Sequence, residues 1–296
     1  MNTGGSVHTP IRIATRGSAQ ARAQAEAVAT ALRSVGADCT LVTVETHGDR
    51  TQVDQTPLHS IGGQGVFTKE VQLAVLDGRA DVAVHSAKDL PTETPEELLI
   101  GAFGPRRDPR DALIGQSLAN LPTGATIATG SVRRRAQIEA VRPDLTFIEL
   151  RGNIPTRLER IPSGGSIVMA VAALEILGLT DRIAEILDPS VFVPAVGQGC
   201  VAAECRTDDL NTAAALAQID HVTTRRAVVV ERAYLAQLGS GCSAPVAAHV
   251  DGLALKAFLA GPSGTFLESI ELSGEMEDDI TMAVAAADRA RIAAGV

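Results

Sequence analysis

An isolated cysteine lies among small, turn-forming residues near the C-terminal end of the chain. The segment Leu238–Pro245 reads LGSGCSAP, and its Cys242 is remote in sequence from Cys39, Cys200 and Cys205. One interpretation is that the sulfur is placed there to be reached and to react, which requires the thiolate form. The alternative is a small, buried hydrophobic side chain at a helix end. The residues around Cys242 leave both interpretations open.

A pair of opposite charges, Lys88 and Asp89, directly follows an apolar strand pattern and precedes Pro91. A fixed carboxylate at such a strand end can stabilise a cationic or N–H-bearing intermediate, while the ammonium group holds an acid. The pair can equally be a turn-stabilising aspartate beside a solvated lysine. Arg16 and Ser18 also allow two interpretations, because an anion-binding helix start and a serine-capped helix start look alike in sequence.

Arginines cluster between residues 133 and 160. This span holds seven arginines and four acidic residues, a net charge of +3 in a chain whose net charge is −9. The planar guanidinium matches a carboxylate or a phosphate, and loop or first-turn positions add free backbone N–H groups. We therefore predict anion contacts for Arg133, Arg134 and Arg151. Ordinary ion pairs on a solvated helix face are expected for three others: Arg135, Arg142 and Arg160.

Alternating strands and helices must position these groups. Short apolar strands are expected at Ile11–Thr15, Cys39–Val44, Ala80–His85, Ala125–Thr129, Leu145–Leu150 and Ser166–Val171. The first helical pattern starts after Ser18 and ends at Gly36. The alternation implies a parallel, helix-covered sheet, and ligands collect at the carboxyl ends of its strands. Three of these ends carry polar groups: residues 15–18, 85–89 and 129–134.

A third unit is expected from about His221 onward, beginning with a helix through Leu238. Three strands and a closing helix follow it: Val246–Val250, Leu253–Leu259, Thr265–Leu272 and about Asp279–Ala294. The short turns between these strands require antiparallel pairing. Gly- and Pro-rich segments at 101–109 and 189–199 mark crossings between two α/β domains, and the second crossing returns the chain to the first domain.

Composition excludes several classes of function. The 296 residues suit two or three domains, and a hydrophobic fraction of 45% is enough for their cores. The net charge of −9 and the aromatic content of 2% argue against a nucleic-acid partner. Neither an apolar run of membrane-spanning length nor a secretory signal is visible, so we expect a cytoplasmic protein. The cysteines are too scattered for a disulfide framework, and no histidine pair has metal-ligand spacing.

Ten motifs are distributed over nearly the whole chain: IATRGS, VFTKE, ADVAVHSAKDLPT, DPRDA, ATGSVRRRAQ, LRGNIPTRL, VPAVGQG, ECR, ERA and GCSAP. No single motif is decisive, but HSAKDLPT together with RGN…TRL and a later GCSAP is highly specific. In this combination the chain resembles the porphobilinogen deaminase (hydroxymethylbilane synthase) family.

The resemblance implies a fold of three domains. Two periplasmic-binding-protein-like α/β domains, the first of them discontinuous, are followed by a small C-terminal α+β domain with a three-stranded antiparallel sheet. The first domain is expected at residues 10–104 with 200–219, the second at 105–199 and the third at 220–296. The second domain supplies the Arg-rich side of the cleft, and the third carries the cofactor-attachment loop.

The resemblance also implies a transferase reaction of tetrapyrrole and heme biosynthesis. In this family four porphobilinogen molecules are condensed head to tail, with loss of ammonia, onto a dipyrromethane cofactor. Hydrolysis then releases linear hydroxymethylbilane. The cofactor is held by a thioether to the cysteine that matches Cys242. A carbon–sulfur bond survives a reducing cytoplasm, and the small neighbours of this cysteine leave room for a bulky tetracarboxylate.

Roles for individual residues follow from the same resemblance. Asp89 matches the catalytic aspartate, which faces positive charge that develops on pyrrole nitrogens. Phe67 matches an aromatic residue that lies over the pyrroles, although a phenylalanine in its surroundings is more often a core residue. The positions that match carboxylate-binding residues are Arg16, Ser18, Lys88, Thr129, Ser131, Arg133, Arg134, Arg151 and Arg157. Each pyrrole ring adds two carboxylates, which accounts for many cationic groups in an acidic protein.

The chain departs from the family pattern at four positions. Gln64 and Ser60 stand where many relatives have lysine, and His47 and Ile176 stand where arginine is frequent. The implied partners are porphobilinogen, water and uroporphyrinogen-III synthase as recipient of the product. A monomer is expected, without metal, nucleic acid or membrane.

Two other classes of function are compatible with parts of the sequence. A non-enzymatic, anion-binding receptor of the two-domain solute type would share the first two domains. It would not need Asp89 and Cys242, and its export would require a signal that the sequence does not show. The effector domain of a transcriptional regulator is a third interpretation, although no helix-turn-helix pattern precedes the first strand.

Overall fold

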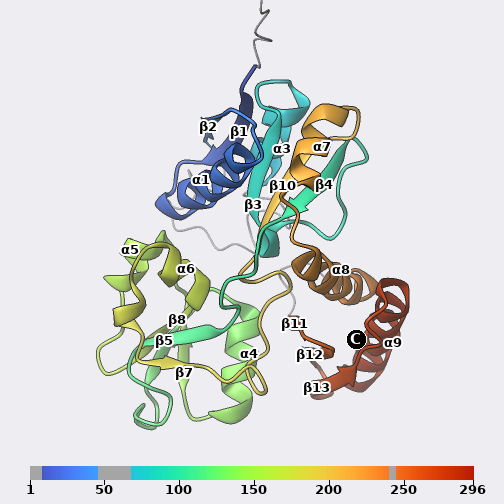
Figure 1. Ribbon diagram of the computed structural model, residues 1–296. Helices are drawn as coiled ribbons and strands as arrows, with labels where there is room; N and C mark the ends of the chain where they lie inside the picture. Colours follow the sequence, from blue (N-terminus) through green and yellow to red (C-terminus); the bar gives the residue numbers. More distant parts are fainter. Residues whose placement is uncertain (1–8, 46–67, 240–244) are drawn as a thin grey trace, which may run out of the picture.

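The computed structural model describes residues 9–45, 68–239 and 245–296. They form two α/β lobes and a smaller C-terminal body (Figure 1). Lobe 1 is built on the sheet that contains the N-terminal strand, and lobe 2 is built on the second α/β sheet. Five positions discussed above lie outside the described residues: His47, Ser60, Gln64, Phe67 and Cys242.

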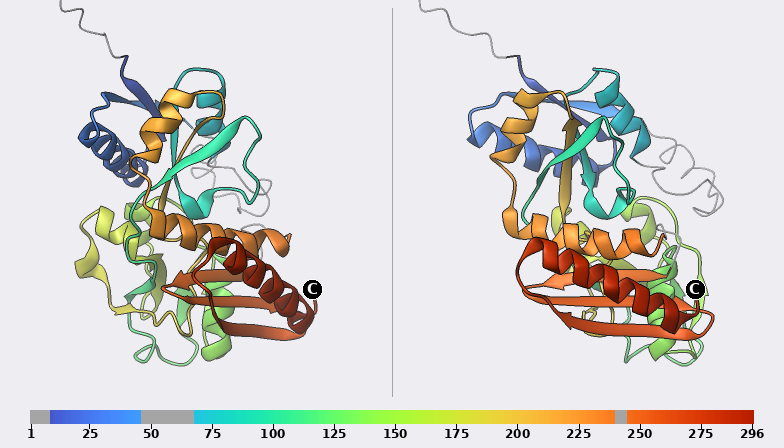
Figure 2. Two further views of the ribbon diagram at one scale, coloured as in Figure 1. Left: turned by 45° about the vertical axis from the view of Figure 1, so that its right-hand side comes forward. Right: turned by 90° about the vertical axis from the view of Figure 1, so that its right-hand side faces the viewer.

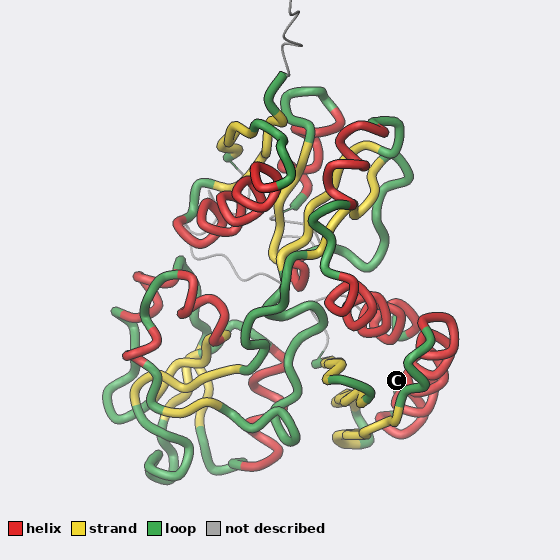
Figure 3. The backbone as a smooth tube through the Cα atoms, in the orientation of Figure 1, coloured by secondary structure: helices red, strands yellow, loops and turns green. Residues whose placement is uncertain are grey.

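Lobe 1 has helices on both faces of its sheet (Figure 3). In spatial order, the described strands are β2 (Cys39–Val44), β1 (Ile11–Arg16), β3 (Val82–Ser86), β10 (Val201–Arg206) and β4 (Leu98–Phe103). The helices are α1 (Ala19–Ser34), α3 (Lys69–Leu76) and α7 (Leu210–Ala217). Side chains alternate along each strand, so Ile13 packs with α1 and α7, whereas its neighbour Ala14 packs with α3.

Lobe 2 repeats this arrangement. Its described strands, in spatial order, are β7 (Thr146–Ile148), β6 (Thr126–Ala128), β8 (Ser166–Ala170), β5 (Asp111–Gly115) and β9 (Glu185–Ile186). The helices are α4 (Val132–Val141), α5 (Ile154–Leu158), α6 (Val171–Ile176) and the short 3-10 turn η3 (Thr180–Arg182). Ile127 packs against α4, while the next residue, Ala128, packs in the cluster of α5 and α6.

Both sheets are mixed, which corrects the expectation of a parallel sheet. Strands β2, β1 and β3 run parallel, but β10 runs antiparallel to β3 and β4, and β5 runs antiparallel to β8 and β9. The two crossings explain the reversals, because β5 enters lobe 2 and β10 re-enters lobe 1 from the side where the lobes meet. A strand that enters there must run against strands whose carboxyl ends point to that side.

The C-terminal body packs two helices on a three-stranded antiparallel sheet (Figure 2). Its elements are α8 (Val222–Gln237), β11 (Val246–Asp251), β12 (Ala254–Gly261), β13 (Gly264–Glu271) and α9 (Met276–Ala294). Tyr234 of α8 is fully buried against this sheet. The sheet also contacts lobe 2, because Phe258 of β12 packs against Val193 and Ala136. Two α/β lobes with a C-terminal antiparallel sheet confirm the predicted fold class.

The strands of lobe 1 come from two separated parts of the chain, residues 11–103 and 201–206. The predicted domain boundaries, 10–104 with 200–219, 105–199 and 220–296, stay predictions. Within the described ranges, no helix combines the length and the apolar character that crossing a membrane requires.

Candidate active site

The carboxyl ends of β1 and β3 open into one pocket of lobe 1. Arg16 ends β1, and the 3-10 turn η2 (Ala87–Asp89) directly follows β3. Arg16, Ser18 and Asp89 line this pocket together. The hydroxyl of Ser18 accepts a hydrogen bond from the backbone N–H of Ala21 at 3.2 Å, so Ser18 caps α1 as predicted. The structure thus gathers three of the predicted site residues.

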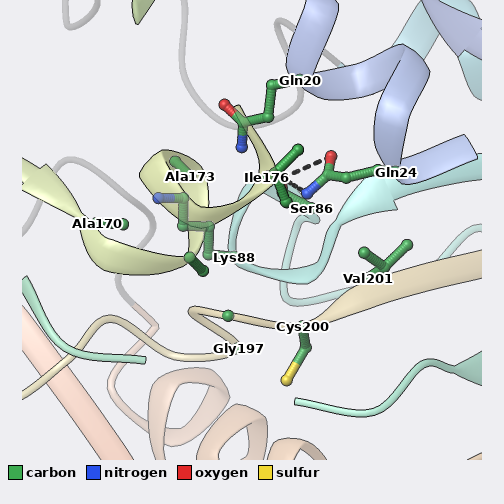
Figure 4. A pocket seen from close by; sticks show the side chains of 12 residues that line it. Gln20, Gln24, Ser86, Lys88, Ala170, Ala173, Ile176, Gly197, Cys200 and Val201 are labelled. Atoms are coloured by element: carbon green, nitrogen blue, oxygen red, sulfur yellow. Dashed lines mark hydrogen bonds between the residues drawn. The ribbon is translucent and has the colours of Figure 1, made fainter. Parts of the chain in front are cut away.

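A second pocket lies between the two lobes (Figure 4). Lobe 1 contributes Lys88 together with Gln24 and Ser86, and the Gln24 amide donates to the Ser86 hydroxyl at 2.9 Å. Lobe 2 contributes α6 with Ala173 and Ile176. Ile176, one of the departures from the family pattern, gives this wall an apolar surface instead of a charged one.

Lys88 experiences charges from both lobes. Burial lowers the pKa of Lys88 to about 8, nearby Arg134 lowers it as well, and Asp89 acts in the opposite direction. The ammonium group also donates to the side-chain oxygen of Gln198 at 3.4 Å. Because burial disfavours the charged form, an anionic ligand at this place would restore the favourable state of the ammonium group.

Asp111, at the start of β5, is a buried carboxylate shared by two arginines. Arg134 donates from Nε and Nη2 to Oδ1 at 3.1 and 2.7 Å, and Nη2 of Arg133 lies 2.8 Å from Oδ2. Gln198 also donates to Oδ1 at 2.9 Å. Burial alone would raise the pKa of Asp111, but the two guanidinium groups hold it well below its ordinary value. Two positive groups and one negative group leave a single net positive charge here.

Arg133 and Arg134 are therefore engaged inside lobe 2. They are only 5% and 9% exposed, and each also donates to a backbone carbonyl, at Val193 (2.8 Å) and Val168 (3.0 Å) respectively. The anion contacts predicted for these two arginines stay a prediction. Their internal bonds restrict such contacts to the remaining N–H groups and to the residual positive charge of the cluster with Asp111.

Arg151 has hydrogen-bonding capacity that the described residues leave unmet. Its side chain is buried, and Nε and Nη2 have no hydrogen-bond partner in the described part of the protein. The carboxylate of Glu149 lies 3.6 Å from Nε, which is an ion pair beyond hydrogen-bonding distance. Burial lowers the pKa of Arg151. A buried guanidinium with unmet donors is the arrangement expected where an anionic ligand belongs.

Arg157 of lobe 2 experiences the charges of neighbouring arginines and also that of Asp89 in lobe 1. Its Nε donates to the carbonyl of Gly152 at 2.7 Å. Burial lowers its pKa to about 10, repulsion from Arg134 and Arg151 adds to this, and attraction from Asp89 opposes it. Asp89 of lobe 1 is therefore close enough for its charge to act on Arg157 of lobe 2.

The two hydroxyl groups predicted to bind carboxylates both support the start of α4. Thr129 is buried and its Oγ1 accepts from the backbone N–H of Ser131 at 3.2 Å. The hydroxyl of Ser131 accepts from the backbone N–H of Arg134 at 3.4 Å and caps the helix. Their ligand-binding role stays a prediction, and the structure adds that both residues fix the helix turn that carries Arg133 and Arg134.

Sequence reasoning missed Asp111 and Gln198, which link Lys88 to the arginine cluster. Asp111 belongs to the motif DPRDA and Gln198 to VPAVGQG, but a lone aspartate or glutamine carries no spacing signal that reveals a distant partner. Ion pairs were expected on the helix face, and Arg135 with Glu139 (3.7 Å) and Arg142 with Asp144 (2.7 Å) form them. Arg160 differs, because it donates to the carbonyl of Arg151 at 3.4 Å.

Comparison of the sequence with models of known protein families shows to which family the chain belongs. A model described as "Porphobilinogen deaminase, dipyromethane cofactor binding domain" matches residues 11–214, and one described as "Porphobilinogen deaminase, C-terminal domain" matches residues 225–291. The chain belongs to the porphobilinogen deaminase family. The resemblance inferred from the ten motifs is confirmed.

Individual relatives of the porphobilinogen deaminase family agree with this assignment. The chain is 46% identical over 281 residues to the porphobilinogen deaminase of Acidothermus cellulolyticus, covering 90% of this chain and 84% of that protein. It is 44% identical over 305 residues to the porphobilinogen deaminase of Cutibacterium acnes, covering 94% and 90%. Among solved structures, the methionine-binding protein MetQ has a TM-score of 0.43 at 15% identity, covering 73% of this chain and 89% of that one.

The described residues fit the acidic dipyrromethane cofactor of this family. Such a cofactor presents several carboxylates, and Arg151 presents buried N–H groups that lack a partner within the described ranges. Lys88 and Arg157 are cationic groups whose burial lowers their pKa, so each gains when a carboxylate binds. The donor set and the ligand are therefore chemically complementary.

Proposed function

We propose that this protein is a hydroxymethylbilane synthase that condenses four porphobilinogens head to tail with loss of ammonia. The growing chain is held on the protein, and hydrolysis releases the linear product. The observation that carries this proposal is geometric: Asp89 lines one pocket with Arg16 and Ser18, and the adjacent Lys88 lines the pocket between the two lobes. A carboxylate beside cationic groups suits an acidic substrate whose reacting centre becomes positive.

Asp89 is the residue to which we assign the chemical step. Loss of ammonia leaves an electron-poor pyrrole, and attack on it places positive charge on the pyrrole nitrogens. A carboxylate fixed at the end of β3 stabilises that charge without having to reorganise, which is the usual source of large electrostatic catalysis. Asp89 is half-buried and lines the pocket of Arg16 and Ser18, so a substrate bound in that pocket can reach its carboxylate.

Binding of the substrate side chains is assigned to the cationic and hydroxyl groups around Asp89. Each pyrrole carries one acetate and one propionate group, so guanidinium forks suit them best. The residues assigned to this task are Arg16, Ser18, Lys88, Thr129, Ser131, Arg133, Arg134, Arg151 and Arg157. Among them Arg151 has the clearest support, because its unmet donors are buried.

The dipyrromethane, when bound, supplies the terminal pyrrole to which porphobilinogen is added. We assign its attachment to a thioether at Cys242 and the covering of its rings to Phe67. In the described part of the chain Cys39, Cys200 and Cys205 are buried, and burial raises the pKa of the last two to about 12 and 11. These thiols are poor nucleophiles, which favours Cys242 as the attachment point.

The cellular setting is part of the same proposal. A monomer in the cytoplasm, handing hydroxymethylbilane to uroporphyrinogen-III synthase, agrees with the family reaction. A non-catalytic anion receptor would explain the two-lobed fold, but it would not explain why the Asp89 carboxylate lines the pocket.

The test is turnover of porphobilinogen by the purified protein, followed through porphobilinogen loss and ammonia release. Four ammonia molecules should appear for each bilane formed. Asp89→Ala should abolish turnover, and Asp77→Asn should not, since Asp77 is an exposed partner of Arg79 at 3.3 Å. An Asp89→Ala protein with intact turnover would refute the role of Asp89, and an inactive wild type would refute the function.

A further inference from the structure

Helix α8 of the C-terminal body lies against the turn that carries Asp89. Val228 is fully buried in one cluster with Ala87 and Leu90, the residues that flank Lys88 and Asp89. One helical turn further along, on the same face of α8, stands Arg232. The turn is therefore supported from outside lobe 1.

Arg232 binds the chain immediately after Asp89. Its Nη2 donates to the carbonyl of Pro91 at 2.8 Å and to the carbonyl of Thr92 at 2.9 Å. Across the described ranges, these are the hydrogen bonds that reach the carbonyls of residues 90–94. Pro91 has no N–H group, so its carbonyl is the one backbone group through which it can form a hydrogen bond.

The guanidinium of Arg232 is held without an ion pair in the described residues. Burial lowers its pKa, and the attraction of Glu204 opposes this from beyond ion-pair distance. Glu204 is itself fully buried, accepts a hydrogen bond from the Gln72 amide at 2.9 Å and lies 3.1 Å from Nε2 of His85, near the end of β3. The carbonyls after Asp89 are thus held by part-buried hydrogen bonds that come from α8.

We infer that Arg232 is a positioning residue for the reaction. By fixing the carbonyls of Pro91 and Thr92, it sets the direction in which η2 ends and so the place of the Asp89 carboxylate. It also ties this turn to α8, the helix that precedes Cys242 in the chain. The inference rests on the proposed function, because it requires Asp89 to act on the substrate.

Arg225 provides a matched control on the same helix. Its Nη2 also donates to two carbonyls of lobe 1, at Ile100 (3.1 Å) and Gly101 (3.0 Å), and its Nε pairs with Asp220 at 2.5 Å. Those carbonyls belong to β4, and none of the hydrogen bonds of Arg225 within the described ranges reaches residues 90–94. Removing Arg225 therefore costs at least as many contacts between α8 and lobe 1 but leaves the segment after Asp89 in place.

The experiment compares Arg232→Met with Arg225→Met in steady-state turnover of porphobilinogen, corrected for the folded fraction. Arg232→Met should lower kcat at least tenfold with KM within about threefold, because small misplacement of a catalytic group is costly. Arg225→Met should keep kcat within about twofold while melting at a lower temperature than the wild type. Arg232→Lys should recover part of kcat, since one ammonium group can reach one carbonyl.

A chemical rescue separates positioning from stability. Millimolar guanidinium should raise the kcat of Arg232→Ala severalfold and leave Arg225→Ala unchanged. A wild-type kcat in folded Arg232→Met, or an equal loss of kcat in both methionine variants, overturns the inference. These results are distinguishable from failure of the proposed function, which would show as a wild type that does not consume porphobilinogen.

Discussion

The guanidinium of Arg134 in α4 and the carboxylate of Asp111 in β5 are joined by two hydrogen bonds, at 2.7 and 3.1 Å. Arg133 shares the same carboxylate at 2.8 Å. The sequence predicts that these arginines bind an anionic ligand, but the structure shows that both already pair with the carboxylate of Asp111. That counter-charge allows two adjacent guanidinium groups to be buried inside lobe 2.

Asp111→Asn is expected to destabilise the protein strongly. The neutral amide keeps the shape of the side chain but leaves two buried guanidinium groups without a counter-charge, which costs about 3–5 kcal/mol in the free energy of unfolding. Urea denaturation measures this loss. Glu139→Gln is the control, because it removes an exposed pair with Arg135 and should cost less than about 0.5 kcal/mol. Equal stability of the two variants would contradict the assignment.

Arg151→Met should separate binding from stability. Its buried guanidinium lacks hydrogen-bond partners for Nε and Nη2 within the described ranges, so a methionine should preserve or raise the free energy of unfolding of the cofactor-free protein. Loss of a charged hydrogen bond to a carboxylate should weaken porphobilinogen binding about tenfold to hundredfold.

Arg142→Met is the matched comparison for Arg151→Met. Arg142 donates to Asp144 and to the carbonyls of Leu118 and Leu121, so this variant should lose stability while KM is unchanged. Thermal melting and steady-state kinetics of both variants give the comparison. A large stability loss in Arg151→Met together with an unchanged KM would show that Arg151 is structural.

The lowered pKa of Lys88 leads us to expect that kcat/KM depends on pH. Its pKa is lowered to about 8, first by burial, so the free protein loses this positive charge as the pH rises through 8. Because kcat/KM reports ionisation of the free enzyme, it should fall about tenfold per pH unit above pH 8. Lys88→Arg keeps its charge and should extend the plateau beyond pH 9. A decline that is identical in both proteins would exclude Lys88 as its source.

The buried carboxylate of Glu231 in α8 joins the lobes to the C-terminal body, so we expect the stability of this junction to decrease in acid. It accepts hydrogen bonds from Arg106 (2.5 Å), from the N–H of Gly197 (2.7 Å) and from the N–H of Val250 (2.8 Å). Burial would raise its pKa, but Arg106 and His249 lower it to about 2.

The stabilisation by Glu231 should be complete above its unfolded pKa of 4.5 and be lost as the pH falls from there toward 2. Melting temperatures of the wild type and Glu231→Gln measure this. At pH 7 the variant should be less stable by roughly 3 kcal/mol or more, and the difference should shrink below pH 4. A difference that does not change with pH would contradict the assignment.

Local signals made much of the fold predictable. Helix α1 begins after Ser18 and ends before Gly36, as expected. The Ser18 side chain accepts a backbone N–H at the start of the helix, and Gly36 adopts the positive φ that is common just after a helix end. The direction of β10 was not predictable, since alternation of strands and helices does not report from which side a strand enters a sheet. That direction is decided by the two crossings between the lobes.

The site was predictable as a set of positions but not as a network. Strand-end placement and family motifs identified Asp89, Lys88 and the arginines. Arg133 and Arg134 pair with Asp111 because α4 packs beside β5 within lobe 2, and Lys88 donates to Gln198 of the second crossing. No local spacing encodes either contact. The support of η2 by Arg232 is of the same kind, because α8 is far from β3 in sequence.

The central claim is that an acidic oligopyrrole grows on the sulfur of Cys242 in the cleft of Asp89. The most direct measurement is the intact mass of the purified protein before and after addition of porphobilinogen. The wild type should exceed its sequence mass by one dipyrromethane and then show stepwise increments of one pyrrole unit, whereas Cys242→Ser should keep its sequence mass. An unmodified wild type with full activity would contradict the claim.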